Sequence, residues 1–93
     1  MTPEKFNDAI NSVSSVLEIS PEIMFSDTRE KHIVDARHIV FYLCKNRFGM
    51  PLVYIQRFCK TRGYSVHHAT IKHGINKIEN LISTDCLNPK IFK

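Results

Sequence analysis

Apolar side chains recur at intervals of four, three and four residues, and this spacing restricts the possible folds more than any other feature of the sequence. Two sets share it: Phe6, Ile10, Val13 and Leu17, and further along the chain Ile71, Ile75, Ile78 and Ile82. An α-helix makes one turn every 3.6 residues, so each set lies along one helical face. No alternation of apolar and polar residues lasts long enough to indicate a strand. The sequence therefore predicts an all-α fold.

Residues that typically begin and end helices divide the chain into a five-helix bundle. Proline is tolerated in the first helical turn, where its missing N–H would be unpaired anyway, and it marks three starts: Pro3, Pro21 and Pro51. Another helix is expected over residues 29–46. After a turn over residues 60–64, in which Gly63 can adopt a positive φ, Ser65 is the expected N-cap of the fifth helix.

The helix expected over residues 29–46 has an apolar inner face: Ile33, Ala36, Val40, Leu43 and Cys44. Arg37 and Lys45 fall outside this stripe, so we expect both to point away from the core. Cys59 falls on the core side of the next helix. We expect thiols buried at these positions to be unreactive.

The length of 93 residues is sufficient for one hydrophobic core. We expect residues 1–87 to form a single helical domain and residues 88–93 a loose tail. No apolar run approaches the roughly 20 residues that a membrane span needs, and no charged-then-apolar leader opens the chain. Three widely spaced cysteines argue against a disulfide framework, so the sequence favours a cytoplasmic protein.

The net charge of +4 is distributed very unevenly. Residues 1–35 carry three basic and seven acidic side chains, whereas residues 36–78 carry eight basic side chains and no acidic one. A solvated surface normally mixes both signs, because unrelieved like charge destabilises the compact state. The acid-free segment therefore indicates a polyanionic partner: a nucleic acid in the first place, with an acidic protein surface as the main alternative.

The basic segment also has the layout of a helix-turn-helix DNA reader, in which a short glycine-containing turn joins two helices. The second helix of such a pair places its N-terminal residues in the major groove, where short polar side chains reach base edges. Here residues 65–70 read Ser-Val-His-His-Ala-Thr, and Lys72 follows. We expect these side chains to face outward, because Ile71 and Ile75 face the core.

Two segments of the chain resemble a known family. Residues 36–43, ARHIVFYL, are similar to the ARQIAMYL helix of the C-terminal domain of the bacterial chromosomal replication initiator DnaA, and residues 68–79 are similar to its HTTVLHAIKKIE segment. The resemblance implies a Trp-repressor-like domain that, in the family, recognises short duplex boxes at replication origins. By position, it implies that Arg37 enters the minor groove. It also implies that His68 and Thr70 belong to the recognition helix.

The family signature GGRDHTTV is altered in this chain. Val66 replaces its arginine, His67 its aspartate and Ala69 its first threonine, and the preceding turn is longer. A carboxylate accepts a hydrogen bond from cytosine N4, whereas a neutral histidine can donate or accept. We therefore expect DNA binding to be retained and the preferred site to be changed or relaxed.

No reading of the sequence as an enzyme is supported. The phosphate-binding pattern G-x-x-x-x-G-K-[ST] is absent, and residues 36–78 contain no carboxylate for acid–base catalysis. No Cys-x-x-Cys pair occurs, and the histidine spacing does not suit a metal. The sequence predicts a non-enzymatic protein without a cofactor. The resemblance suggests a DNA-binding module standing alone, as expected in a phage or mobile element.

The predicted partner is double-stranded DNA, bound during replication initiation or its regulation. The residues expected at the DNA are Arg37, Lys45, Arg57, Lys60, Arg62, Tyr64, Ser65, His67, His68, Thr70 and Lys72. An alternative is a protein-interaction module that mimics the initiator domain and docks on a host or phage replication or transcription protein. A pull-down from nuclease-treated lysate separates these readings, because only a partner bridged by DNA is then lost.

Overall fold

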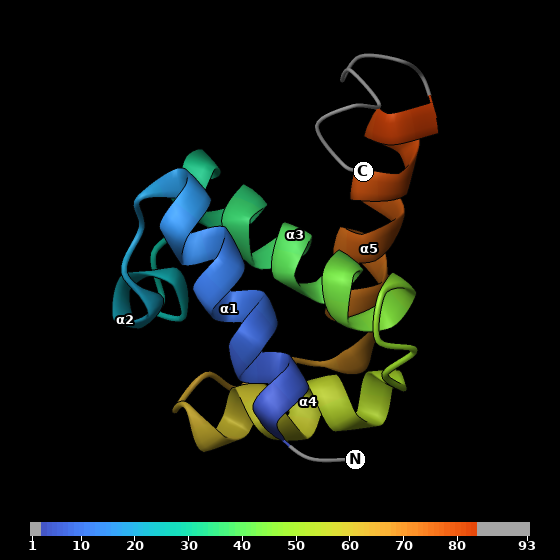
Figure 1. The fold of residues 1–93 in the computed structure, drawn as a ribbon, viewed down its shortest axis with the longest axis horizontal. Helices are drawn as coiled ribbons and strands as arrows, with labels where there is room; N and C mark the ends of the chain where they lie inside the picture. Colours follow the sequence, from blue (N-terminus) through green and yellow to red (C-terminus); the bar gives the residue numbers. More distant parts are fainter. Residues whose placement is uncertain (1–2, 84–93) are drawn as a thin grey trace.

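The computed structural model describes residues 3–83 and forms five α-helices (Figure 1). In chain order they are α1 Pro3–Leu17, α2 Pro21–Met24, α3 Lys31–Asn46, α4 Leu52–Thr61 and α5 His68–Ser83. No strand occurs between residues 3 and 83, so the predicted all-α fold is confirmed. The end of the predicted domain and the predicted tail, residues 84–93, lie outside the described residues.

The central helix α3 packs against all four other helices (Figure 1). Its most extensive contact is with α5, which also packs on α4, and α1 crosses α3 and reaches both α2 and α4. Helices α4 and α5 therefore form the predicted helix-turn-helix pair against one end of the bundle. None of the described helices combines the length and the apolar character that crossing a membrane requires.

The two apolar stripes of the sequence form much of the core. Their first three members are all buried: Phe6, Ile10 and Val13 in α1, and Ile71, Ile75 and Ile78 in α5. The prediction is wrong for Leu17, which is 41% exposed, and Ile82 is only half-buried. Both residues lie at or near the end of their helix, where a stripe can extend beyond the helices that cover it.

A row of aromatic rings connects α1, α2 and α4 to the turn of the helix-turn-helix. The centroids of Phe58 and Phe6 lie 5.5 Å apart, those of Phe6 and Phe25 6.0 Å, and those of Phe25 and Tyr64 5.8 Å. Such spacings are favourable for aromatic pairs beyond the apolar area that they bury. The row fixes the turn against the amino-terminal half of the chain.

The turn after α4 adopts the Schellman arrangement, in which two amides beyond the helix bond back to its last carbonyls. The N–H of Gly63 donates to the carbonyl of Lys60 at 2.9 Å, and that of Tyr64 donates to the carbonyl of Cys59 at 3.0 Å. Gly63 has a φ of 79°, as predicted for this position. After this turn α5 begins only at His68, so the prediction that Ser65 caps α5 is wrong.

The contact between α3 and α5 depends on a glycine. A Cβ atom on Gly74 would lie 2.5 Å from Cδ2 and 2.9 Å from Cγ of His38, so any larger residue would displace that ring. His38 is only 9% exposed, and its Nδ1 is buried without a hydrogen-bond partner among the described residues. A neutral histidine is thus enclosed where the two longest helices meet.

Burial lowers the pKa of His38 below 6.5, because the charged form loses its hydration. The positive charge of Lys77 lowers this pKa further, as do His73 and Arg37, whereas Asp35 opposes them. The folded protein therefore binds a proton at His38 less readily than the unfolded chain does.

We expect the free energy of unfolding to fall as the pH is lowered from about 7.5 to about 5.5. The stability that the neutral ring contributes is complete above the unfolded pKa of 6.5 and is lost progressively below it. Urea denaturation at several pH values measures this. A His38→Gln variant, whatever its overall stability, should show a smaller decrease; equal decreases in both proteins would contradict the assignment.

Candidate nucleic-acid interface

The first turn of α5 is built around His67, which is the N-cap. Its backbone carbonyl accepts hydrogen bonds from the N–H groups of Thr70 and Ile71 at 3.0 and 3.3 Å. Its side-chain Nδ1 accepts the N–H of Ala69 at 3.1 Å, and so satisfies one of the amides that a helix start leaves unpaired. The ring of His68 stacks on that of His67, with centroids 4.3 Å apart. Both histidines are exposed.

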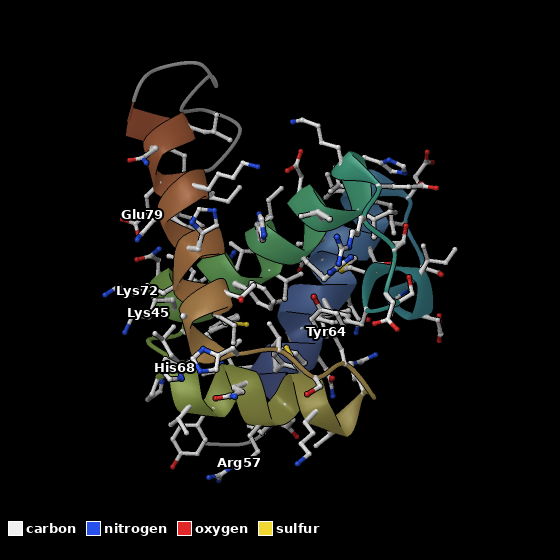
Figure 2. The ribbon with its side chains drawn as sticks, turned by 180° about the vertical axis from the view of Figure 1, so that it is seen from behind. Lys45, Arg57, Tyr64, His68, Lys72 and Glu79 are labelled. Carbon is white, nitrogen blue, oxygen red and sulfur yellow. The ribbon has the colours of Figure 1, made fainter. Side chains whose placement is uncertain are left out.

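Exposed basic side chains surround this turn. Figure 2 shows His68 and Lys72 of α5 on the same side of the molecule as Lys45 of α3, while Arg57 projects outward from α4. The predicted site residues that the structure leaves exposed are Lys45, Arg57, Lys60, Arg62, Ser65, His67, His68, Thr70 and Lys72. The structure therefore brings most of the predicted residues to the outer surface of α4, α5 and their connection.

The positive charge of this surface is not neutralised locally. Of the basic side chains in the described part of residues 36–78, only Lys77 has a carboxylate within 4.0 Å, namely Asp35 at 3.9 Å. Arg57 instead lies over the Tyr54 ring, at 5.3 Å from its centroid. Cations without paired carboxylates remain available for an external anion.

A hollow of about 340 Å³ separates α4 from the segment that leads into α5. It is lined by Val53, Gln56, Arg57, Lys60, Ser65 and Val66. Val53 and Gln56 are not among the residues predicted at the DNA from the sequence. Val53 lies four residues before Arg57, and Gln56 lies four residues before Lys60, so each shares a face of α4 with a predicted basic residue, and this could have identified them.

Arg62 is exposed but directed toward α1, since its Nη2 donates to Oδ1 of Asn7 at 2.9 Å. It is the C-cap of α4, and the connecting segment separates it in sequence from His68, where α5 begins. The structure therefore does not group Arg62 closely with the histidines.

Arg37 is the predicted site residue that the structure places most differently. The prediction that it points away from the core is wrong: the residue is only 7% exposed. Its Nη1 donates to the hydroxyl of Tyr64 at 2.5 Å, and its Nη2 donates to the carbonyl of Thr28 at 2.6 Å. The guanidinium also lies against the Tyr64 ring, 4.9 Å from its centroid. The physical reason is that the loop before α3 and the turn after α4 converge on this part of α3.

Tyr64, predicted to face DNA from the turn, is half-buried and points inward (Figure 2). Its ring packs edge-on against Phe25, and its hydroxyl accepts the bond from Arg37. The Schellman turn at Gly63 directs the residue after it back over the bundle. Buried Arg37 and half-buried Tyr64 thus form a hydrogen-bonded pair behind the exposed surface.

The cysteines and histidines of residues 3–83 were also candidates for nucleophilic or metal chemistry. Cys44 and Cys59 are buried and free, as predicted for core positions. Loss of hydration raises the pKa of each thiol to about 12, which leaves both thiols unreactive near neutral pH. Within residues 3–83, no three His, Cys, Asp or Glu side chains are grouped so that they could hold a metal ion.

Comparison with known proteins identifies a family with this helix arrangement. A family model described as the bacterial dnaA protein helix-turn-helix matches residues 6–78. The chromosomal replication initiator protein DnaA of Ureaplasma parvum is 32% identical over 76 residues, which cover 82% of this chain and 16% of that protein. The DnaA of Lachnoclostridium phytofermentans is 33% identical over 76 residues, with the same coverage.

The chain matches only a small part of these relatives. For the DnaA of Aliarcobacter butzleri, the match is 32% identical over 81 residues, which is 87% of this chain and 18% of that protein. The chain therefore spans 16% to 18% of the length of the relatives described here. No solved structure is a significant match.

We expect Tyr64→Phe to lower the free energy of unfolding by about 1–3 kcal/mol, because a buried guanidinium N–H loses its acceptor. Urea denaturation measures the change. Tyr54→Phe is the matched control, since Tyr54 is also half-buried but its hydroxyl has no hydrogen-bond partner within residues 3–83. Equal effects of the two substitutions would show that the Arg37–Tyr64 bond contributes nothing specific.

Proposed function

The chain belongs to the family of bacterial DnaA helix-turn-helix domains, and from this premise we propose that it binds double-stranded DNA, with α5 in the major groove. The observation that carries the proposal is the exposed first turn of α5, surrounded by cations without paired carboxylates. The N-terminal end of a helix also favours anions through its free amides and dipole.

The proposed roles follow from position and chemistry. His67, His68 and Thr70 lie in the first turn of α5 and would face base edges. Lys45, Arg57, Lys60 and Lys72 would contact phosphates, with the Ser65 hydroxyl beside them, and Arg62 would lie at the margin of the contact. Phosphate contacts set the position of the protein on the duplex, and base contacts select the sequence.

We further propose that the protein acts in replication initiation or its regulation by DNA binding alone. The matched segment of the relatives covers the helix-turn-helix and 16% to 18% of their length. The described residues include an exposed basic surface, which supports binding to DNA, and two thiols that burial makes unreactive.

Arg37 enters the proposal as the minor-groove contact that the family resemblance implies. In the structure, Tyr64 and Thr28 hold its guanidinium. Contact with DNA therefore requires the side chain to leave both acceptors, and the hydrogen bonds to the duplex must replace those that are lost. Tyr64, freed by the same movement, would lie at the edge of the groove.

We expect Lys72→Gln and Arg57→Gln each to weaken binding by a similar factor on every duplex and to reduce the slope of log Kd against log salt by about 1. Fluorescence anisotropy at several salt concentrations measures both quantities, with a random duplex and one bearing the family's box as probes. Lys31→Gln is the control, because Lys31 is an exposed cation in the acidic half of the chain, 3.5 Å from Asp35.

An equal loss of DNA affinity in the Lys31→Gln variant would show that binding depends only on the overall charge of the protein. Absence of wild-type binding near physiological salt would refute DNA binding and favour docking on a protein. Exposed apolar residues of the acidic half, Val16, Leu17 and Ile23, would then be the first surface to test.

For Arg37, we expect Tyr64→Phe to raise affinity for duplex DNA by roughly 2-fold to 10-fold, because the substitution weakens the contact that holds the guanidinium. The gain should disappear in the Arg37→Gln background. If Tyr64→Phe binds no better than the wild type, while circular dichroism shows it to be folded, Arg37 has a structural role only.

A further inference from the structure

The cap of α5 determines which nitrogen of His67 carries the proton. The N–H of Ala69 donates to Nδ1 at 3.1 Å, so Nδ1 must present a lone pair. In a neutral imidazole one nitrogen is the acceptor and the other is the donor. The proton of neutral His67 is therefore on Nε2.

The same bond also sets the direction of that donor. Nδ1 faces the first amides of α5, so Nε2, on the other side of the ring, points away from the helix end. The ring of His68, stacked at 4.3 Å with an angle of 28° between the planes, limits rotation on one face. His67 is exposed, and Nε2–H is available to a ligand beyond the end of α5.

We propose that His67 is a specificity-determining residue that donates from Nε2 to a base in the major groove, and that the base is guanine. The proposal rests on the proposed DNA binding, with α5 in the major groove. Guanine presents two acceptors there, N7 and O6, whereas adenine and thymine each present one, N7 and O4, and cytosine presents only the N4 donor. A capping aspartate at this position would present an oxygen and select the opposite pattern. The changed signature thus exchanges an acceptor for a donor.

The chain allows a matched test at this one position. Asparagine and aspartate have nearly the same shape, and both are good N-caps. In His67→Asn, one oxygen can accept the Ala69 N–H while the amide nitrogen still donates outward. In His67→Asp, both side-chain oxygens are acceptors. The pair therefore differs in hydrogen-bond polarity while the cap is kept.

The wild-type protein and the two variants each select duplexes from a random pool, and this identifies the base pair at which their preferences differ. Fluorescence anisotropy then measures Kd on duplexes that differ only at that base pair. We expect the wild type and His67→Asn to prefer guanine there by about 10-fold, and His67→Asp to prefer cytosine or adenine. The ratio of affinities is the readout, because the added negative charge of aspartate weakens binding to every duplex.

Selection of the same bases by all three proteins would overturn the proposal. So would salt-dependent wild-type binding without a base preference, and in both cases the proposed DNA binding would stand. If the wild type binds no duplex near physiological salt, both proposals fail together. Circular dichroism of the three proteins should show equal helix content, which indicates that both variants fold like the wild type.

Discussion

The hydrogen bonds of the buried Arg37 guanidinium are the interaction on which the position of the helix-turn-helix relative to the rest of the bundle depends most. It joins α3 to the carbonyl of Thr28 before that helix and to the hydroxyl of Tyr64 after α4. A buried charge is strongly destabilising without partners, so these contacts specify one position of the turn relative to the bundle. Its Nε has no partner among the described residues, which leaves the cluster incompletely satisfied and open to exchange with another acceptor.

The turn that Arg37 anchors also determines what α5 can present. A Schellman motif at Gly63 directs Tyr64 inward, and the chain then continues to His67 before the next helix begins. A histidine rather than a hydroxyl residue caps that helix, so the cap and the proposed base contact share one side chain. Local backbone geometry and the proposed recognition chemistry are therefore coupled in a few residues.

The middle of α5 packs closely against α3. Gly74 admits the His38 ring between the two helices, and the loss of hydration keeps that histidine neutral. Lys77 reaches across to Asp35 at 3.9 Å, an exposed pair that contributes little stability by itself. Packing therefore sets the direction of α5. The basic side chains around its first turn are not needed for that purpose and are free to bind a ligand.

The sequence by itself determined the helical fold, the location of the basic segment and the family. Helix formation depends mainly on local properties such as apolar periodicity and proline positions. Phe6, Ile10 and Ile71 are therefore buried as predicted. Only the tertiary structure decided the places of Arg37, Tyr64 and His67. Helical periodicity put Arg37 outside the apolar stripe, but two distant segments converge on it and cover it. The N-cap of α5 depended on how many residues the preceding turn uses, which is set by contacts between parts of the chain that are far apart in sequence.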